Sequence, residues 1–159
     1  MTDMTRLQVD LDGWLCLIDP YAFASYINDA PTHADQLTRY AAERRAEHGI
    51  VMHLGAEAAL DVLAPAVPRT DQPLRTFTHT VVASRGVLAV PTFKELTGAA
   101  GFSGRRLVSD ATPRIGRAPG RYLVTVAQYA QEPRITLAIA PAPRPVADPA
   151  IAANVVPWL

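Results

Sequence analysis

An antiparallel β-sandwich, or a partly open barrel, with one α-helix after the first hairpin is the fold class that the sequence predicts. Apolar and polar residues alternate with period two along residues 75–83 and 135–139, as in strands with one buried face. Turn residues separate such segments, and residues 34–47 combine a helical composition with helix start and stop signals. At 159 residues the chain has room for one domain with about seven or eight strands.

The first expected element is a hairpin over residues 6–18. Its Asp-Gly pair is a two-residue turn that suits the twist of two strands, and it places Leu7 opposite Ile18. Proline, asparagine and aspartate then interrupt the pattern, so residues 19–31 are expected to form a loop.

The helix is predicted over residues 34–47, after Thr32 as a capping residue and before Gly49 as a terminator. Its outward face is expected to hold the charged residues Arg39, Glu43, Arg44 and Glu47. A strand follows at 50–54. Residues 56–64 fit a helix by propensity and a strand by alternation and flanking prolines, and we favour the strand.

A second hairpin is expected over residues 74–93, and we interpret it as the element around which the rest of the chain is organised. Residues 84–86 offer a three-residue turn whose glycine can adopt a left-handed conformation. In that register Phe77 faces Phe93, and His79 points into the core as a hydrogen-bonded structural histidine.

Further elements are expected downstream: a glycine-rich loop, a short strand and two longer strands, at residues 98–104, 106–110, 121–129 and 135–139. After Pro141 the chain is too rich in proline for a sheet or a helix. We therefore divide the chain into a single β-rich domain, residues 1–140, and an extended tail, residues 141–159.

Charge and hydropathy argue against binding to nucleic acid or anionic lipid, against a membrane span and against export. The net charge of +0 provides no global field that would attract nucleic acid or anionic lipid. No apolar run approaches the ~18 residues of a membrane span, and the first ten residues lack the features of a signal peptide, so we expect a cytoplasmic protein. The single cysteine, Cys16, is expected to be a buried, inert thiol.

Motifs that would indicate catalysis are incomplete. Residues 10–13 resemble the first motif of haloacid dehalogenase-type phosphatases, but Trp14 replaces its threonine and an Asp-Gly turn explains the same residues. Residues 101–104 fall one residue short of a nucleophile elbow. The histidines lack the spacing of zinc ligands: His33, His48, His53 and His79. The sequence therefore predicts no enzyme, no metal and no cofactor.

Two segments are candidate partner-binding sites. Five arginines lie within 17 residues whose only acidic residue is Asp110: Arg105, Arg106, Arg114, Arg117 and Arg121. Guanidinium groups bind carboxylates or phosphates in a forked geometry, and we favour an acidic protein partner over nucleic acid. The chain ends with the apolar pair Trp158 and Leu159, which docks either on its own domain or on a partner.

A small-molecule pocket is an alternative. Aromatic residues from distant segments would line it inside the sandwich, with His79 as their polar partner: Tyr21, Phe23, Tyr40, Phe77 and Tyr122. Of these residues, Tyr40, Phe77, His79 and Tyr122 are the predicted ligand-binding set.

The layout also resembles a known family. The expected order is an N-terminal hairpin, one helix and then further hairpins. These include a turn between apolar strands at residues 84–90 and a strand that starts with Pro-Gly-Arg-Tyr at residues 119–122. This arrangement resembles small bacterial β-sandwich proteins related to the competence protein J nuclease inhibitors, and immunity proteins of polymorphic toxin systems. The likeness covers roughly residues 50–140.

The resemblance implies a non-enzymatic protein-binding module, of the inhibitor or immunity type, with a toxin, a nuclease or its own oligomer as partner. It assigns no residue of this chain to a site. Two alternatives stay open: the small-molecule pocket, and an assembly subunit whose C-terminal tail inserts into a neighbour.

Overall fold

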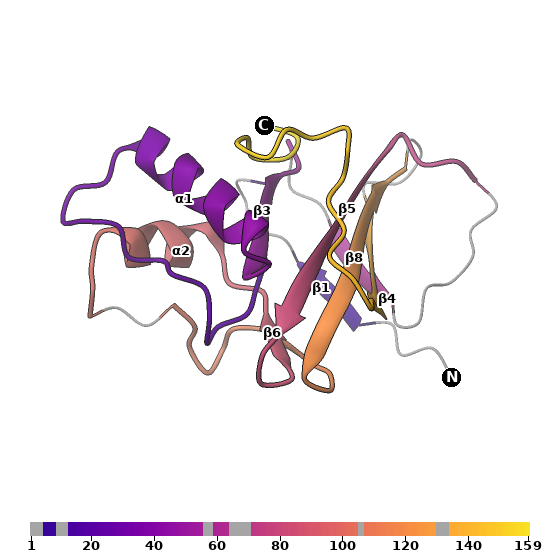
Figure 1. The fold of residues 1–159 in the computed structure, drawn as a ribbon, viewed down its shortest axis with the longest axis horizontal. Coiled ribbons are helices and arrows are strands. Elements are labelled where there is room, and N and C mark those ends of the chain that lie inside the picture. The colour runs from indigo at the N-terminus through magenta and orange to yellow at the C-terminus, as the bar shows by residue number, and fades with distance from the viewer. Residues whose placement is uncertain (1–4, 9–12, 56–58, 64–70, 105–106, 130–133) are drawn as a thin grey trace.

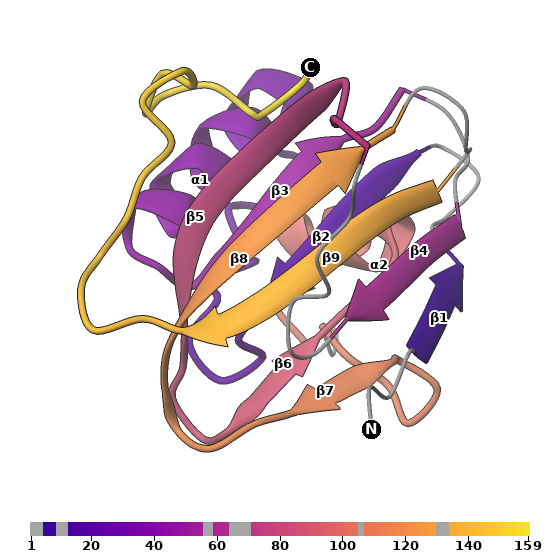
Figure 2. The same ribbon diagram turned by 90° about the vertical axis from the view of Figure 1, so that its right-hand side faces the viewer.

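The computed structural model describes residues 5–8, 13–55, 59–63, 71–104, 107–129 and 134–159. These residues form nine strands and two helices in three layers: a five-stranded sheet, a four-stranded sheet and the helices (Figures 1 and 2). The predicted mainly β, sandwich-like fold is confirmed. No helix in this part of the chain has both the length and the apolar character needed to cross a membrane.

The five-stranded sheet has β9 at its centre. From one edge to the other its strands are β1 (Thr5–Gln8), β4 (Ala59–Leu63), β9 (Arg134–Pro141), β8 (Gly120–Gln128) and β5 (Arg75–Ala83). Neighbouring strands are antiparallel except β4 and β9, which run parallel. This parallel pair differs from the all-antiparallel arrangement expected from the sequence.

The four-stranded sheet is shorter and has both faces covered. Its strands, in order, are β3 (Gly49–His53), β2 (Trp14–Ile18), β6 (Val87–Ala89) and β7 (Arg114–Gly116). Every residue of β2 is buried, Cys16 included. Alternate side chains point to opposite faces, so Leu15 and Leu17 enter the core between the sheets while Trp14 packs beneath the helices.

Two capping boxes begin the helices, α1 (His33–Arg45) and α2 (Phe93–Ala100). The Oγ1 atom of Thr32 accepts the Asp35 N–H at 3.1 Å, and Asp35 in turn accepts the Thr32 N–H at 2.9 Å. Thr92 and Glu95 repeat this exchange at 3.1 and 2.7 Å. Such reciprocal bonds satisfy donors that a helix start leaves open. The sequence analysis found α1 but missed α2, whose first residue was assigned to a strand and whose last three were assigned to a loop.

Neither predicted hairpin forms. β5 pairs along its length with β8, so that Phe77 lies opposite Val126 rather than Phe93. Leu7 lies opposite Leu60, and Ile18 pairs with Gly49 and Ala89. The alternation identified the buried face of β5 correctly, whereas β2 is buried on both faces. Both sheets present buried faces, and residues 84–86 pass from one sheet to the other.

The turn at residues 84–86 is tight, as predicted, although it joins the two sheets. Gly86 has a φ of 74°, in the left-handed region, and a Cβ there would lie 2.4 Å from the Arg117 carbonyl oxygen. The Arg117 N–H donates to the Gly86 carbonyl at 2.8 Å. Only glycine fits this close approach of two turns.

Other expected strands are found with small shifts, at β3, β4, β8 and β9. The short strand expected at 106–110 is absent from its described residues, 107–110, and β7 follows instead. The expectation that Glu43 and Arg44 face solvent is wrong, because their side chains are buried. Glu43 accepts hydrogen bonds from the Ala24 N–H and from His48, whereas Arg44 donates to the tail.

The C-terminal segment, residues 142–159, lies against its own chain. Val146 pairs with the open edge of β5: its carbonyl accepts the Thr80 N–H at 3.0 Å, and its N–H donates to the Thr80 hydroxyl at 3.0 Å. The segment then crosses to α1, where it is yellow in Figure 1, and the Pro157 carbonyl accepts the His53 N–H of β3. It thereby covers one side of the sandwich.

Candidate functional site

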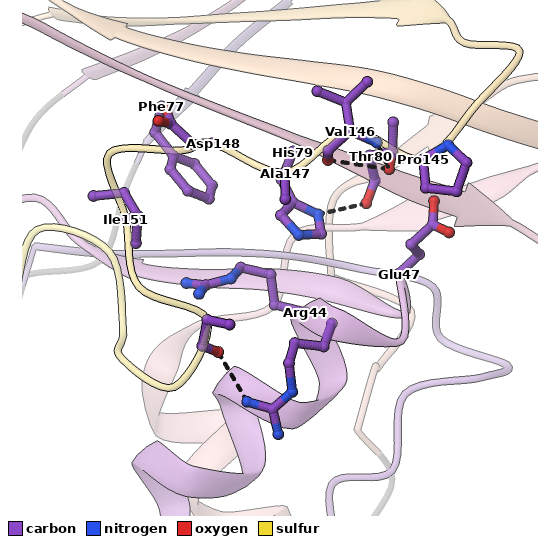
Figure 3. Close-up of a pocket in the computed structure, with 12 residues that line it drawn as sticks. Arg44, Glu47, Phe77, His79, Thr80, Pro145, Val146, Ala147, Asp148 and Ile151 are labelled. Carbon is purple, nitrogen blue, oxygen red and sulfur yellow. Dashed lines mark hydrogen bonds between the residues drawn. The ribbon is translucent and has the colours of Figure 1, made fainter.

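A cavity of about 250 Å³ lies between the end of α1, the edge of β5 and the C-terminal segment (Figure 3). Each wall comes from a different part of the chain. Arg44 and Arg45 are the last two residues of α1, and Glu47 follows the helix. Phe77 and His79 belong to β5. The C-terminal segment closes the third side with residues that include Val146, Asp148 and Ile151.

His79 supplies a hydrogen-bond acceptor to this cavity. It shares a face of β5 with Phe77 because strand side chains alternate. The ring lies 2.8 Å, through Nδ1, from the Thr80 carbonyl oxygen, which can only accept, so we assign the proton to Nδ1. The described hydrogen bond of the ring is the one through Nδ1, and no partner is found for Nε2 among the described residues. Burial lowers the pKa of His79, and the positive charge of Arg44 lowers it further. The hydrogen bond to the Thr80 carbonyl and the charges of Glu47 and Asp148 raise it, but the pKa remains below its ordinary value.

Two arginines make the wall beneath His79 positive. Arg44 is only 3% exposed, and it donates to the Val155 and Ala152 carbonyls at 2.8 and 2.9 Å. Arg45 donates to the Ala153 carbonyl at 2.9 Å. Burial lowers the pKa of Arg44, and the neighbouring Arg45 lowers it further. Within the described part of the chain, no carboxylate forms an ion pair with either guanidinium.

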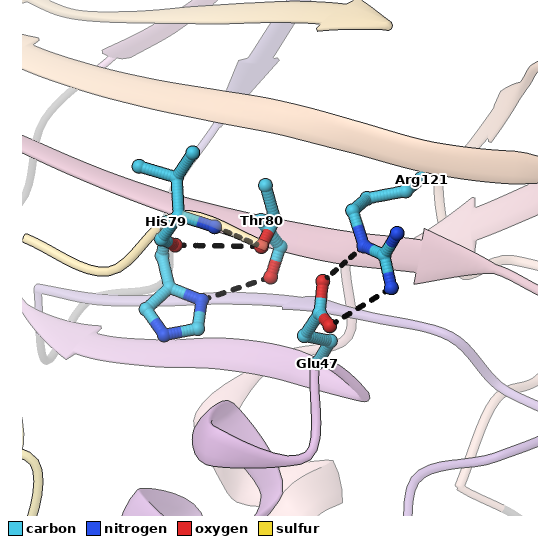
Figure 4. Close-up of polar contacts among 5 residues, drawn as sticks. Glu47, His79, Thr80 and Arg121 are labelled. Atoms are coloured by element: carbon cyan, nitrogen blue, oxygen red, sulfur yellow. Dashed lines mark hydrogen bonds and ion pairs between the residues drawn. The ribbon is translucent and has the colours of Figure 1, made fainter. Parts of the chain in front are cut away.

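The carboxylates of the cavity are already engaged. Glu47 pairs with Arg121 through two contacts, at 2.7 and 3.2 Å (Figure 4). Burial raises the pKa of Glu47, but hydrogen bonds from Arg121 and Thr80 outweigh it, so the pKa lies below its ordinary value. Asp148 accepts backbone N–H groups of Thr78 and Ala150 at 3.2 and 2.9 Å.

Of the four predicted ligand-binding residues, the structure brings only Phe77 and His79 to this cavity. Tyr40 lies in the core beneath the helices, where burial raises the pKa of its hydroxyl and no hydrogen-bond partner is found among the described residues. Tyr122 lies in the core between the sheets, and its hydroxyl donates to the Ala118 carbonyl. The two tyrosines are therefore separate from the cavity.

The predicted arginine cluster is only partly visible. Arg105 and Arg106 lie outside the described residues. Arg121 is paired with Glu47, a counter-charge from a distant segment that sequence spacing did not reveal. Arg114 and Arg117 donate to nearby backbone carbonyls, and no described carboxylate pairs with them.

A different group of arginines gathers where the chain passes between the sheets. Because the turns at 84–86 and 117–119 lie side by side, Arg85 comes next to Arg117. The Arg85 guanidinium lies over the ring of Tyr21, 4.6 Å from its centroid, and Tyr21 is 57% exposed. We define Tyr21, Arg85, Arg117 and Arg121 as the arginine end. Sequence analysis did not identify Arg85, because its neighbours belong to other segments.

The apolar C-terminal pair is divided between core and solvent. Trp158 packs against the core between the sheets, and the Arg75 guanidinium lies 3.9 Å from its ring centroid. Leu159 is 62% exposed. In the described residues, no group of three or more histidine, cysteine or acidic side chains is arranged to hold a metal ion.

Comparisons with known proteins show which solved structures have a similar fold. No protein-family model matches the sequence, and no curated protein matches it. The chain is similar to the solved structure titled "Crocagin biosynthetic gene J", with a TM-score of 0.55 and 16% identity over 89% of this chain and 97% of that one. It is also similar to ComJ from Bacillus subtilis, titled an inhibitor of the DNA degrading activity of NucA.

The similarity to ComJ has a TM-score of 0.50 and 6% identity over 88% of this chain and 96% of that one. Nearly the whole length of each neighbour is therefore matched. The resemblance to competence protein J-like β-sandwich proteins, predicted from two short stretches, is confirmed as a likeness of fold.

Proposed function

We propose that this protein is a non-enzymatic protein-binding module of the inhibitor or immunity type, and that it binds an acidic surface of its partner through the arginine end. A solved protein of similar fold, ComJ, is titled an inhibitor of a nuclease activity, and this supports the functional class. The partner would be a toxin or a nuclease whose active surface the module covers.

The observation that carries the proposal is the juxtaposition of Arg85, Arg117 and Tyr21. Arg85 and Arg117 have no carboxylate partner among the described residues, and Tyr21 presents more than half of its surface. Arginine and tyrosine are enriched in the residues that dominate binding energy at protein interfaces. The turns that hold them are fixed to each other by the Arg117–Gly86 hydrogen bond, so little ordering is required on binding.

The test is isolation and reconstitution of a complex. The full chain would be cross-linked in cells of its source, the partner identified, and the two purified proteins mixed. We expect a stoichiometric complex by light scattering, which weakens as salt is raised. In the variant R85E/R117E we expect binding weaker by a factor of about 100, since two attractive charges become repulsive.

Arg39 provides the matched control. Like Arg117 it is half-buried and donates one hydrogen bond to a backbone carbonyl, but it lies on α1, away from the arginine end. R39E should bind as the unaltered chain does, whereas R117E should not. Equal loss in R39E and R117E, or a chain that retards DNA but forms no protein complex, would contradict the proposal.

A further inference from the structure

Arg44 poses an electrostatic problem that the described residues do not solve. A charge with 3% exposure is costly unless an opposite charge compensates it. The described partners of Arg44 are two backbone carbonyls and the ring of Phe77, whose centroid lies 5.8 Å from the guanidinium carbon, and none of them is a carboxylate. The adjacent Arg45 adds a second positive charge at the rim of the same cavity. The carboxylates on the other walls compensate only in part, because Arg121 neutralises Glu47. Asp148, which accepts two backbone N–H groups, keeps its charge, so two guanidinium groups face one carboxylate without an ion-pair partner among the described residues.

The remaining walls define what else an occupant must offer. The Nε2 atom of His79 accepts no hydrogen bond from the described residues, and His79 lines the cavity, so this atom can accept from an O–H or N–H donor of an occupant. Phe77 at the base, and Val146 and Ile151 on the tail side, provide apolar contact. At about 250 Å³ the cavity is slightly smaller than typical ligand sites, which begin at about 300 Å³, so its occupant must be small.

We propose that this cavity binds a small organic carboxylate with a hydroxyl or N–H group and a short apolar or aromatic body. The carboxylate meets Arg45 at the rim and lies in the field of Arg44. The donor group bonds to His79 Nε2, and the body packs on Phe77 and Ile151 (Figure 3). The occupant completes the charge balance of Arg44. This site is separate from the arginine end and goes beyond the proposed protein-binding function.

Mandelate is a suitable probe because it combines a carboxylate, a hydroxyl and a ring. Phenylacetate lacks the hydroxyl, and 1-phenylethane-1,2-diol lacks the carboxylate. Binding would be followed by calorimetry and by shifts of backbone amide resonances in the full-length chain. We expect mandelate to bind with a dissociation constant below about 1 mM, and each analogue to bind about tenfold more weakly. The shifted amides should be those of residues 77–80, 146–148, 150 and 151, since positions 145 and 149 are prolines without an N–H.

Variants locate the binding. R45Q should weaken mandelate binding about tenfold, whereas R39Q, which alters a comparable single hydrogen bond elsewhere on α1, should leave it unchanged. H79N keeps a donor toward the Thr80 carbonyl and removes the Nε2 acceptor, so it should reduce the preference for mandelate over phenylacetate. Circular dichroism would verify that each variant is folded.

Three outcomes would overturn the proposal. One is a dissociation constant for mandelate weaker than about 10 mM with the unaltered chain. The second is equal binding of mandelate and the diol, which would show that no carboxylate is recognised. The third is binding that R45Q and H79N leave unchanged, which would place the probe elsewhere. None of these results bears on the complex formed through the arginine end.

Discussion

At the scale of single residues, Glu47 connects three parts of the molecule. It has a φ of 61°, and a left-handed conformation costs a residue other than glycine roughly 1–2 kcal/mol. In this position its carbonyl accepts the Val82 N–H of β5 at 2.9 Å, and its carboxylate pairs with Arg121 of β8. The contacts to the five-stranded sheet offset the backbone strain at the end of α1.

The Glu47–Arg121 pair gives stability a pH dependence. Because the pKa of Glu47 is lowered in the folded chain, the unfolded chain takes up the proton first as pH falls. The stabilisation is therefore present above the unfolded pKa, about 4.5, and is lost as pH falls through the folded pKa. We expect E47Q to lower the Tm by a few degrees at neutral pH and by much less near pH 3.

The measurement is thermal unfolding of the unaltered chain, E47Q, R121Q and the double variant at both pH values. A double-mutant cycle separates the pair from other effects of each substitution. A coupling that persists unchanged in acid would show that the carboxylate charge is not what stabilises this contact.

At the scale of elements, the two capping boxes hold helices that lie on the same sheet. Replacing Thr92 removes the acceptor for the Glu95 N–H, so T92A should reduce the free energy of unfolding by about 1 kcal/mol in urea. Thr38 lies exposed within α1, where alanine is the better helix former, so T38A should cost nothing or stabilise slightly. A loss in T38A as large as that in T92A would contradict a capping role.

Much of the secondary structure, but not the strand pairing, could be predicted from the sequence. Helix α1 and most strands follow from local alternation and capping residues. The partners of β5 and β2 do not, because each core-facing strand fits several neighbours and the Asp-Gly and Ser-Arg-Gly turns resemble hairpin turns. The brief signal for α2, a Thr-x-x-Glu capping box before an apolar run, was present and overlooked.

In the candidate sites, too, local neighbours could be predicted from the sequence but contacts between distant segments could not. Phe77 and His79 were predicted together because period-two spacing places them on one face of a strand. The opposing wall of the cavity is built by Arg44, 35 positions earlier, and Asp148, 69 positions later than His79. Such proximity depends on the path of the whole chain, as does the pairing of Arg121 with Glu47.

At the scale of the whole molecule, the C-terminal segment joins all three layers. It pairs with the edge of β5, hydrogen-bonds to β3, and places Val156 in the core beneath the helices and Trp158 against the core between the sheets. These contacts lie within one chain, so the segment functions as part of the fold in this structure.

Removal of the Trp158 ring should test the importance of this segment. W158A deletes a partly buried indole and its contact with Arg75, so we expect a loss of about 2 kcal/mol in the free energy of unfolding. L159A changes an exposed neighbour and should stay within about 0.5 kcal/mol of the unaltered chain. Both values come from urea unfolding. Equal effects of the two substitutions would show that the ring contributes no more than its exposed neighbour.

The place of β9 in the five-stranded sheet also governs how this protein is made. β1 and β4 pair early in the chain, but among the described strands β9, residues 134–141, is the one that joins them to β8 and β5 in this sheet. During synthesis, the pair β1–β4 and the pair β8–β5 therefore each have an unpaired strand edge until β9 has left the ribosome. Folding must wait for the last strand, and throughout that interval the unpaired edges are open to aggregation or to chaperone binding.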